Sequence, residues 1–124
     1  MRSFYSIILF LLFSAGLSGQ VDLTATAGTP TGGPWTTLKA AFDAINAGTH
    51  QGSIVISISA NTTETAVCVM NSSGAGSASY TDILIKPTAT ATISGATATG
   101  RGLIELNGAD NVTIDGAISG STRI

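Results

Sequence analysis

The sequence is poor in charge: Lys, Arg, Asp and Glu make up 10% of its 124 residues, whereas a soluble domain has about a quarter. The net charge is −2 and the five basic residues form no cluster, which argues against nucleic acid or another polyanion as a partner. Cysteine is almost absent as well. Cys68 cannot form an intrachain disulfide, and its position between Val67 and Val69 predicts a small buried hydrophobe.

Motifs of common enzyme sites are also missing. His50 is the only histidine and is expected in the loop after a helix, without an orienting partner or a nucleophile. The sequence contains no G-x-S-x-G elbow, no phosphate-binding loop and no Cys/His zinc spacing. What is abundant instead is Gly, Ala, Ser and Thr, a composition that disfavours long helices and favours short strands joined by tight turns.

Residues 1–19 have the pattern of a secretory signal peptide. Arg2 precedes an apolar stretch over residues 4–13, and small residues follow up to Gly19. Cleavage is expected after Gly19, with Ser18 as the alternative. An uncleaved membrane anchor is the competing interpretation, but the apolar stretch is shorter than the roughly 18 residues that a membrane span needs. We therefore expect an exported protein that is not stably inserted in a membrane after cleavage.

The segment "WTTLKAAFDAIN" predicts an amphipathic helix over about residues 36–46, within an N-terminal cap over residues 20–52. Its apolar residues recur at intervals of three and four, which places them on one face. Thr36 or Thr37 can cap the start, and Gly48 suits a left-handed position after the end. The residues of the apolar face are Trp35, Leu38, Phe42 and Ile45.

Residues 53–124 contain short apolar runs with a period of two, each ending near Gly, Pro or Asn, which predicts strands too closely spaced for intervening helices. Ile54, Ile83 and Val112 are separated by equal intervals of 29 residues. This repeat favours a solenoid in which Ile83 stacks on Ile54 and Val112 on Ile83, while an antiparallel sandwich is the alternative.

The phrases "LIELN", "GADNVTIDG" and "WTTLKAAFDAIN" resemble the N-terminal part of right-handed parallel β-helix proteins of the pectate-lyase-like superfamily, in particular long secreted surface proteins of Bacteroidetes-type bacteria. The resemblance implies an all-β fold: a right-handed parallel β-helix, about three coils within residues 53–124, with an N-terminal amphipathic capping helix. Because such proteins continue for many more coils, the chain is expected to be an N-terminal fragment. The expected location is secreted or at the bacterial cell surface, reached through the periplasm.

Enzymes with that fold use carboxylates, Ca²⁺ and basic residues, so the resemblance makes the acidic residues candidates for such a site. Asp110 and Asp115 bracket one strand but point to opposite faces of it, which falls short of the several converging oxygens that a metal needs. Glu105 should project outward beside the loop of Arg101 and form a surface ion pair with it. The sequence therefore predicts no catalytic, cofactor-binding or metal-binding residue and no cofactor.

The expected function is an exported, non-catalytic β-helix module for surface adhesion or scaffolding. One alternative is the N-terminal cap of a carbohydrate-active enzyme, a polysaccharide lyase or hydrolase, whose catalytic coils lie beyond Ile124; another is a purely structural stalk. The expected partners are a surface polysaccharide or glycan and, through the unpaired strand edge of the last coil, further copies of the fragment.

Overall fold

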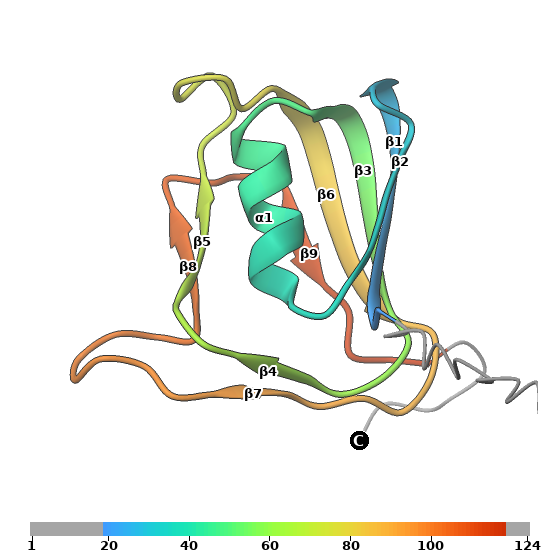
Figure 1. Cartoon of the computed structure of the whole chain (residues 1–124). Coiled ribbons are helices and arrows are strands. Elements are labelled where there is room, and N and C mark those ends of the chain that lie inside the picture. The colour runs from blue at the N-terminus through green and yellow to red at the C-terminus, as the bar shows by residue number, and fades with distance from the viewer. Residues whose placement is uncertain (1–18, 119–124) are drawn as a thin grey trace, which may run out of the picture.

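A computed structural model describes residues 19–118 of the chain, so the predicted signal peptide lies almost wholly outside the described residues. Within this part the chain forms one helix and nine strands (Figure 1). The elements in chain order are β1 (Val21–Gly28), β2 (Thr31–Trp35), α1 (Leu38–Asn46), β3 (His50–Ile58), β4 (Thr62–Glu64), β5 (Cys68–Asn71), β6 (Tyr80–Pro87), β7 (Ile93–Gly95), β8 (Ile104–Asn107) and β9 (Val112–Ile114).

The helix begins two residues later than predicted, because Thr37 is its N-cap and accepts a hydrogen bond from the backbone N–H of Ala40 at 3.3 Å. It ends before Gly48, whose φ of 75° is left-handed as expected. Three residues of the predicted apolar face are fully buried, but Trp35 is not part of the helix and instead ends β2. The buried residues of α1 are Leu38, Ala41, Phe42 and Ile45.

The largest sheet contains five strands in the order β2-β1-β3-β6-β9. Strand β1 runs antiparallel to both β2 and β3, whereas β3, β6 and β9 are parallel. Ile54 pairs with Ile83, and Ile83 pairs with Val112. The equal 29-residue intervals in the sequence therefore correspond to in-register pairing across these three strands, as predicted.

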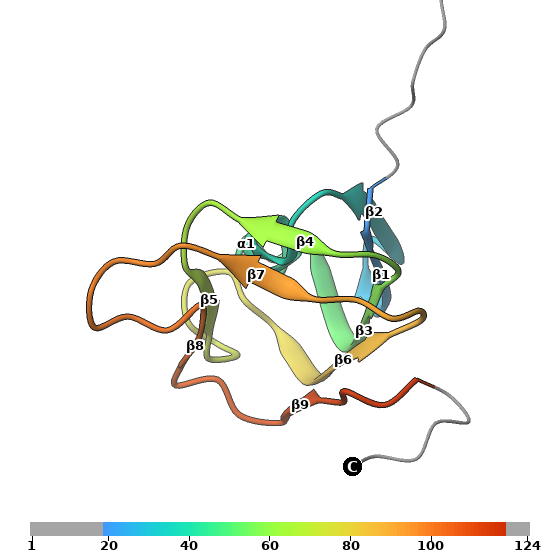
Figure 2. The ribbon, with the colours of Figure 1, turned by 90° about the horizontal axis from the view of Figure 1, so that it is seen from below.

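Two further sheets contain two short parallel strands each, β4 with β7 and β5 with β8 (Figure 2). Helix α1 lies between the five-stranded sheet and β5, and its apolar face fills the space between them (Figure 1). The residues of the resulting core are Val21, Leu23, Leu38, Ala41, Phe42, Ile45, Ile54, Ile56, Ile58, Cys68, Met70, Ala78, Tyr80, Ile83 and Ile85.

The prediction of an all-β right-handed parallel β-helix of about three coils, with a helix as its cap, is wrong. The largest sheet is mixed because β1 is antiparallel to its neighbours, and the other sheets are small. The 29-residue spacing reflects only the in-register pairing of β3, β6 and β9. It does not predict that the chain reverses direction between β1 and β2. Strand β2, over Thr31–Trp35, was not predicted, and Trp35 was expected on the helix face instead.

Candidate functional site

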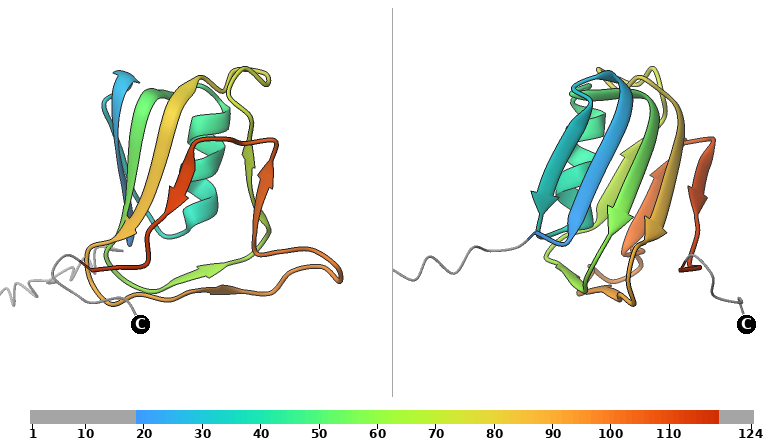
Figure 3. Two further views of the ribbon diagram at one scale, coloured as in Figure 1. Left: turned by 180° about the vertical axis from the view of Figure 1, so that it is seen from behind. Right: turned by 90° about the vertical axis from the view of Figure 1, so that its right-hand side faces the viewer.

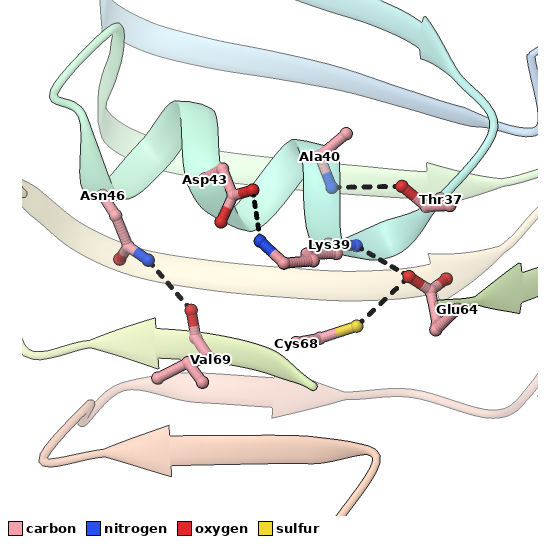
Figure 4. A network of polar contacts seen from close by, with 8 residues as sticks. All are labelled: Thr37, Lys39, Ala40, Asp43, Asn46, Glu64, Cys68 and Val69. Atoms are coloured by element: carbon pink, nitrogen blue, oxygen red, sulfur yellow. Dashed lines mark hydrogen bonds and ion pairs between the residues drawn. The ribbon is translucent and has the colours of Figure 1, made fainter. Parts of the chain in front are cut away.

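The buried acidic side chain of Glu64 lies at the start of α1 (Figure 4). Strand β4 places this carboxylate so that its Oε1 accepts the backbone N–H of Leu38 at 2.8 Å and its Oε2 accepts that of Lys39 at 3.1 Å. The side chain is only 1% exposed. A residue from a distant strand therefore satisfies two of the backbone donors that the first turn of a helix leaves without partners.

The sequence of α1 explains why this carboxylate is needed. The first turn contains no acidic residue and carries Lys39, although the positive end of the helix dipole favours a negative charge there. Glu64 supplies that charge from outside the helix. Sequence reasoning missed this role, and the only signal for it was a helix start with a lysine and no acid.

Cys68 is the second member of this buried group (Figure 4). Its Sγ donates to Oε2 of Glu64 at 3.3 Å, and its side chain is fully buried, as the sequence predicted. Burial, together with the hydrogen bond and the negative charge of Glu64, raises the pKa of the Cys68 thiol to about 12. The thiol therefore stays protonated at neutral pH and is a poor nucleophile.

A polar groove runs over the outer side of α1 and the chain between β4 and β5, with the 96–101 loop on its far side. Its volume is about 530 Å³. The lining side chains include both charged groups and small aliphatic groups. They belong to Lys39, Asp43, Asn46, Thr65, Ala66, Val67, Val69, Ala96, Thr97, Ala98 and Arg101.

Each cationic group of the groove already has an anionic partner. Lys39 Nζ lies 2.6 Å from Oδ2 of Asp43, and Arg101 contacts Glu105 through two bonds of 2.6 and 2.5 Å. The hydrogen bonds from Arg101 lower the pKa of the Glu105 carboxyl, and the same bonds raise the pKa of Arg101. The predicted ion pair of Arg101 and Glu105 is thus confirmed, and both pairs are exposed enough to open at little cost.

The other sequence candidates do not converge with this groove. Asp110 and Asp115 lie on either side of β9, and Asp115 Oδ1 accepts the backbone N–H of Ala117 at 2.9 Å. His50 was expected in a loop but begins β3, where it is 2% exposed. Its Nδ1 lies 2.7 Å from the carbonyl oxygen of Thr29, so its role is in packing.

A smaller and more apolar hollow lies at the side of β9, with a volume of about 130 Å³. Most of its lining comes from aliphatic side chains of the large sheet and of β7. The lining residues are Ile58, Ile85, Lys86, Pro87, Ala91, Ile93, Ile114, Asp115 and Gly116.

Residues 19–118 contain no group of three His, Cys, Asp or Glu side chains placed to hold a metal ion, and no helix in this range is long and apolar enough to cross a membrane. No family model, curated protein or solved structure matches the chain. The resemblance to pectate-lyase-like proteins therefore gains no support from these comparisons.

Proposed function

We propose that the protein is an exported, non-catalytic module for scaffolding or adhesion at a bacterial cell surface. One observation carries the proposal: in the part of the chain described here, the only buried carboxylate, Glu64, is occupied in holding the start of α1. Enzyme sites commonly keep a buried or perturbed acid free for proton transfer. In this protein the buried carboxylate of Glu64 has a structural role instead, because it accepts backbone hydrogen bonds from the start of α1.

Export is supported by the order of residues at the start of the chain, where Arg2 precedes an apolar stretch and small residues. N-terminal sequencing of the protein recovered outside the cytoplasm should begin near Gln20. A protein that retains Phe4 there would contradict signal cleavage and favour an anchor.

A glycan is the partner class that the polar groove fits best. Sugar hydroxyls both donate and accept hydrogen bonds, and the groove offers donors on Lys39 and Arg101, acceptors on Asp43, and hydroxyls on Thr65 and Thr97. Its volume of about 530 Å³ falls within the range of roughly 300–1,000 Å³ for small-ligand sites. The near balance of charge in the groove favours a neutral or weakly acidic sugar chain.

Binding can be tested by NMR titration with an uncharged malto-oligosaccharide, and an oligogalacturonate serves as the polyanionic comparison that should bind no better. We expect shifts confined to the groove, weakened by Lys39→Ala and by Arg101→Ala. Lys86→Ala is the matched control, because Lys86 is exposed but lies outside the groove. Equal weakening by all three variants would indicate non-specific charge attraction and contradict a groove site.

Catalysis is tested with the same chain on pectin and alginate, on which we expect no cleavage. Cleavage that is abolished by Glu105→Ala or Asp115→Ala would refute the non-catalytic proposal and favour the carbohydrate-active enzyme.

A further inference from the structure

The corner between β8 and β9 contains the one Asn-Gly pair of the sequence, Asn107–Gly108 (Figure 3). Strand β8 ends at Asn107. Gly108 has a φ of 71°, a left-handed conformation that glycine adopts without the steric cost of a side chain. Its N–H donates to the carbonyl of Leu106 at 3.1 Å, which closes a γ-turn around Asn107. The shape of the corner therefore explains why glycine follows asparagine here.

An asparagine that precedes glycine is chemically labile for a steric reason. The backbone nitrogen of the next residue can attack Cγ of the side-chain amide, and glycine has no Cβ to shield that nitrogen. Asn107 and Gly108 are both exposed. Within the described chain, a Cβ built on Gly108 would meet nothing closer than Cβ of Ser72 at 3.6 Å. Packing at this corner therefore does not keep the amide of Asn107 away from the nitrogen of Gly108.

The reaction at this pair needs no reactant other than water. The bond between the Gly108 nitrogen and Cγ of Asn107 forms, and the bond between Cγ and Nδ2 breaks. Ammonia leaves with the proton of the Gly108 N–H, so that a succinimide ring remains. Water then adds to one of the two ring carbonyls and opens the ring. Opening at one carbonyl gives aspartate, and opening at the other gives isoaspartate, in which the main chain passes through Cβ and Cγ.

The neighbouring strand opposes this reaction, because it holds the amide that must move. Nδ2 of Asn107 donates to Oδ1 of Asn71 at 3.1 Å, across the parallel pair of β5 and β8. Asn71 is itself fixed: its N–H donates to Oδ1 of Asn46 at 3.1 Å, and its carbonyl accepts the hydroxyl of Tyr80 at 2.6 Å. The amide of Asn107 must therefore leave Asn71 before its Cγ can turn toward Gly108.

We propose that Asn107 is a site of spontaneous deamidation and that Asn71 controls its rate through the hydrogen bond to the side-chain amide. The other four asparagines precede Ala, Thr, Ser or Val, whose Cβ atoms shield the next backbone nitrogen. The isoaspartate product lengthens the main chain and shifts the carbonyl of residue 107, which in the natural chain accepts the N–H of Ser72 at 3.2 Å. Deamidation therefore loosens the end of β8, and this inference does not depend on export or on glycan binding.

The test is mass spectrometry of peptides from the full chain after incubation in mildly alkaline buffer, which favours loss of the proton from the Gly108 N–H. Conversion of an amide to a carboxylate raises the mass, whereas isomerisation at the Asp115–Gly116 pair leaves it unchanged, so the two reactions are distinguished. We expect conversion at Asn107 alone, more slowly in the folded chain than in the chain unfolded in urea. No conversion at Asn107, earlier conversion at another asparagine, or equal rates in the folded and unfolded chains would overturn the proposal.

Variants of the neighbouring strand test the role of Asn71. Asn71→Ala removes the acceptor and should raise the rate about two- to tenfold, as the loss of one hydrogen bond of ordinary strength allows. Asn71→Asp keeps an acceptor oxygen and should react as slowly as the natural chain. Asn46→Ala is the matched control for general loosening of β5, because it removes the acceptor of the Asn71 N–H and leaves the Asn71 side chain in place.

An unchanged rate in Asn71→Ala, or an equal increase in Asn46→Ala, would refute control by Asn71. Hydrogen exchange of the Ser72 amide follows the consequence for β8, and it should quicken as isoaspartate accumulates. Unchanged protection of this amide after conversion would contradict the loosening of the strand end.

Discussion

The end of the molecule that holds α1, β1 and β2 buries its large apolar side chains, whereas the end that holds β7, β8 and β9 leaves two of them about half exposed. Leu23 and Phe42 are almost completely buried at the first end. Leu106 and Ile114 occupy equivalent inward positions in their strands at the second end, yet about half of each side chain is accessible. The pattern of alternating apolar residues is the same at both ends. The difference in burial therefore comes from the elements that cover these side chains.

At the first end the helix supplies the cover. Phe42 and Ile45 fill the space between the large sheet and β5, and the carboxylate of Glu64 holds the start of the helix in place. At the second end no element of the described chain lies over β9. Burial, and with it most of the hydrophobic stabilisation, is therefore concentrated around α1.

The largest expected effect is a core truncation at the first end. Phe42→Ala should cost about 3–5 kcal/mol of unfolding free energy, because it removes a fully buried aromatic side chain and leaves a cavity. Ile114→Ala, at the second end, should cost less than about 1 kcal/mol of unfolding free energy, because the side chain is already half exposed. Urea denaturation measures both.

Lys39→Ala is the control for Phe42→Ala, because Lys39 lies on the outer face of the same helix. This substitution should lower the unfolding free energy by well under about 1 kcal/mol. Equal losses from Phe42→Ala and Ile114→Ala would show that the two ends are equally well packed, contrary to the comparison above.

The next effect in size concerns the helix cap. Glu64→Ala should lower the unfolding free energy by about 1–3 kcal/mol, because it leaves the buried N–H of Leu38 without an acceptor. Glu64→Gln keeps one acceptor oxygen and should cost less, while losing the favourable charge at the positive end of the helix. A loss of helical circular dichroism in Glu64→Ala before global unfolding would support local release of α1. Equal stability of the alanine and glutamine variants would contradict a capping role.

The sequence was sufficient to predict the helix and most strands, because their periodicities are local properties. It also predicted the pairing of Ile54, Ile83 and Val112, which follows from equal spacing. It did not predict β2 or the antiparallel pairing of β1, because Gly and Pro residues at 28–34 are typical of loops and conceal a short edge strand. That omission led to the wrong fold class.

Of the buried pair Glu64 and Cys68, only Cys68 could be predicted from the sequence. Burial of Cys68 followed from its apolar neighbours, but Glu64 stands in the polar segment "NTTETA" and has no local sign of burial. Its partners Leu38 and Lys39 are 26 and 25 residues away in the sequence. A contact of that range depends on the tertiary fold, which the periodicity of the strands did not determine.

A moderate effect is expected from alkaline pH. The Cys68 thiol has a folded-state pKa raised to about 12 from an ordinary 9.0, so the unfolded chain ionises first as the pH rises. Stability should be independent of this group below pH 9 and should fall progressively between pH 9 and 12, where the unfolded chain has lost the thiol proton and the folded chain still holds it. The pKa of Tyr80 is also raised by burial and acts in the same direction. Denaturation of the natural chain and of Cys68→Ser isolates the thiol: identical alkaline slopes would contradict its assigned role.

The smallest effect should come from the two surface ion pairs, one at each end of the comparison. Asp43→Asn removes the partner of Lys39 on α1, and Glu105→Gln, in β8, removes the partner of Arg101. Exposed ion pairs contribute little to folding stability, because water and salt screen the attraction and because two long side chains must be ordered. Both variants should therefore leave the urea midpoint unchanged within error, at low and at high salt. A clear, salt-sensitive loss in only one of them would mean that charge, and not burial alone, distinguishes the two ends.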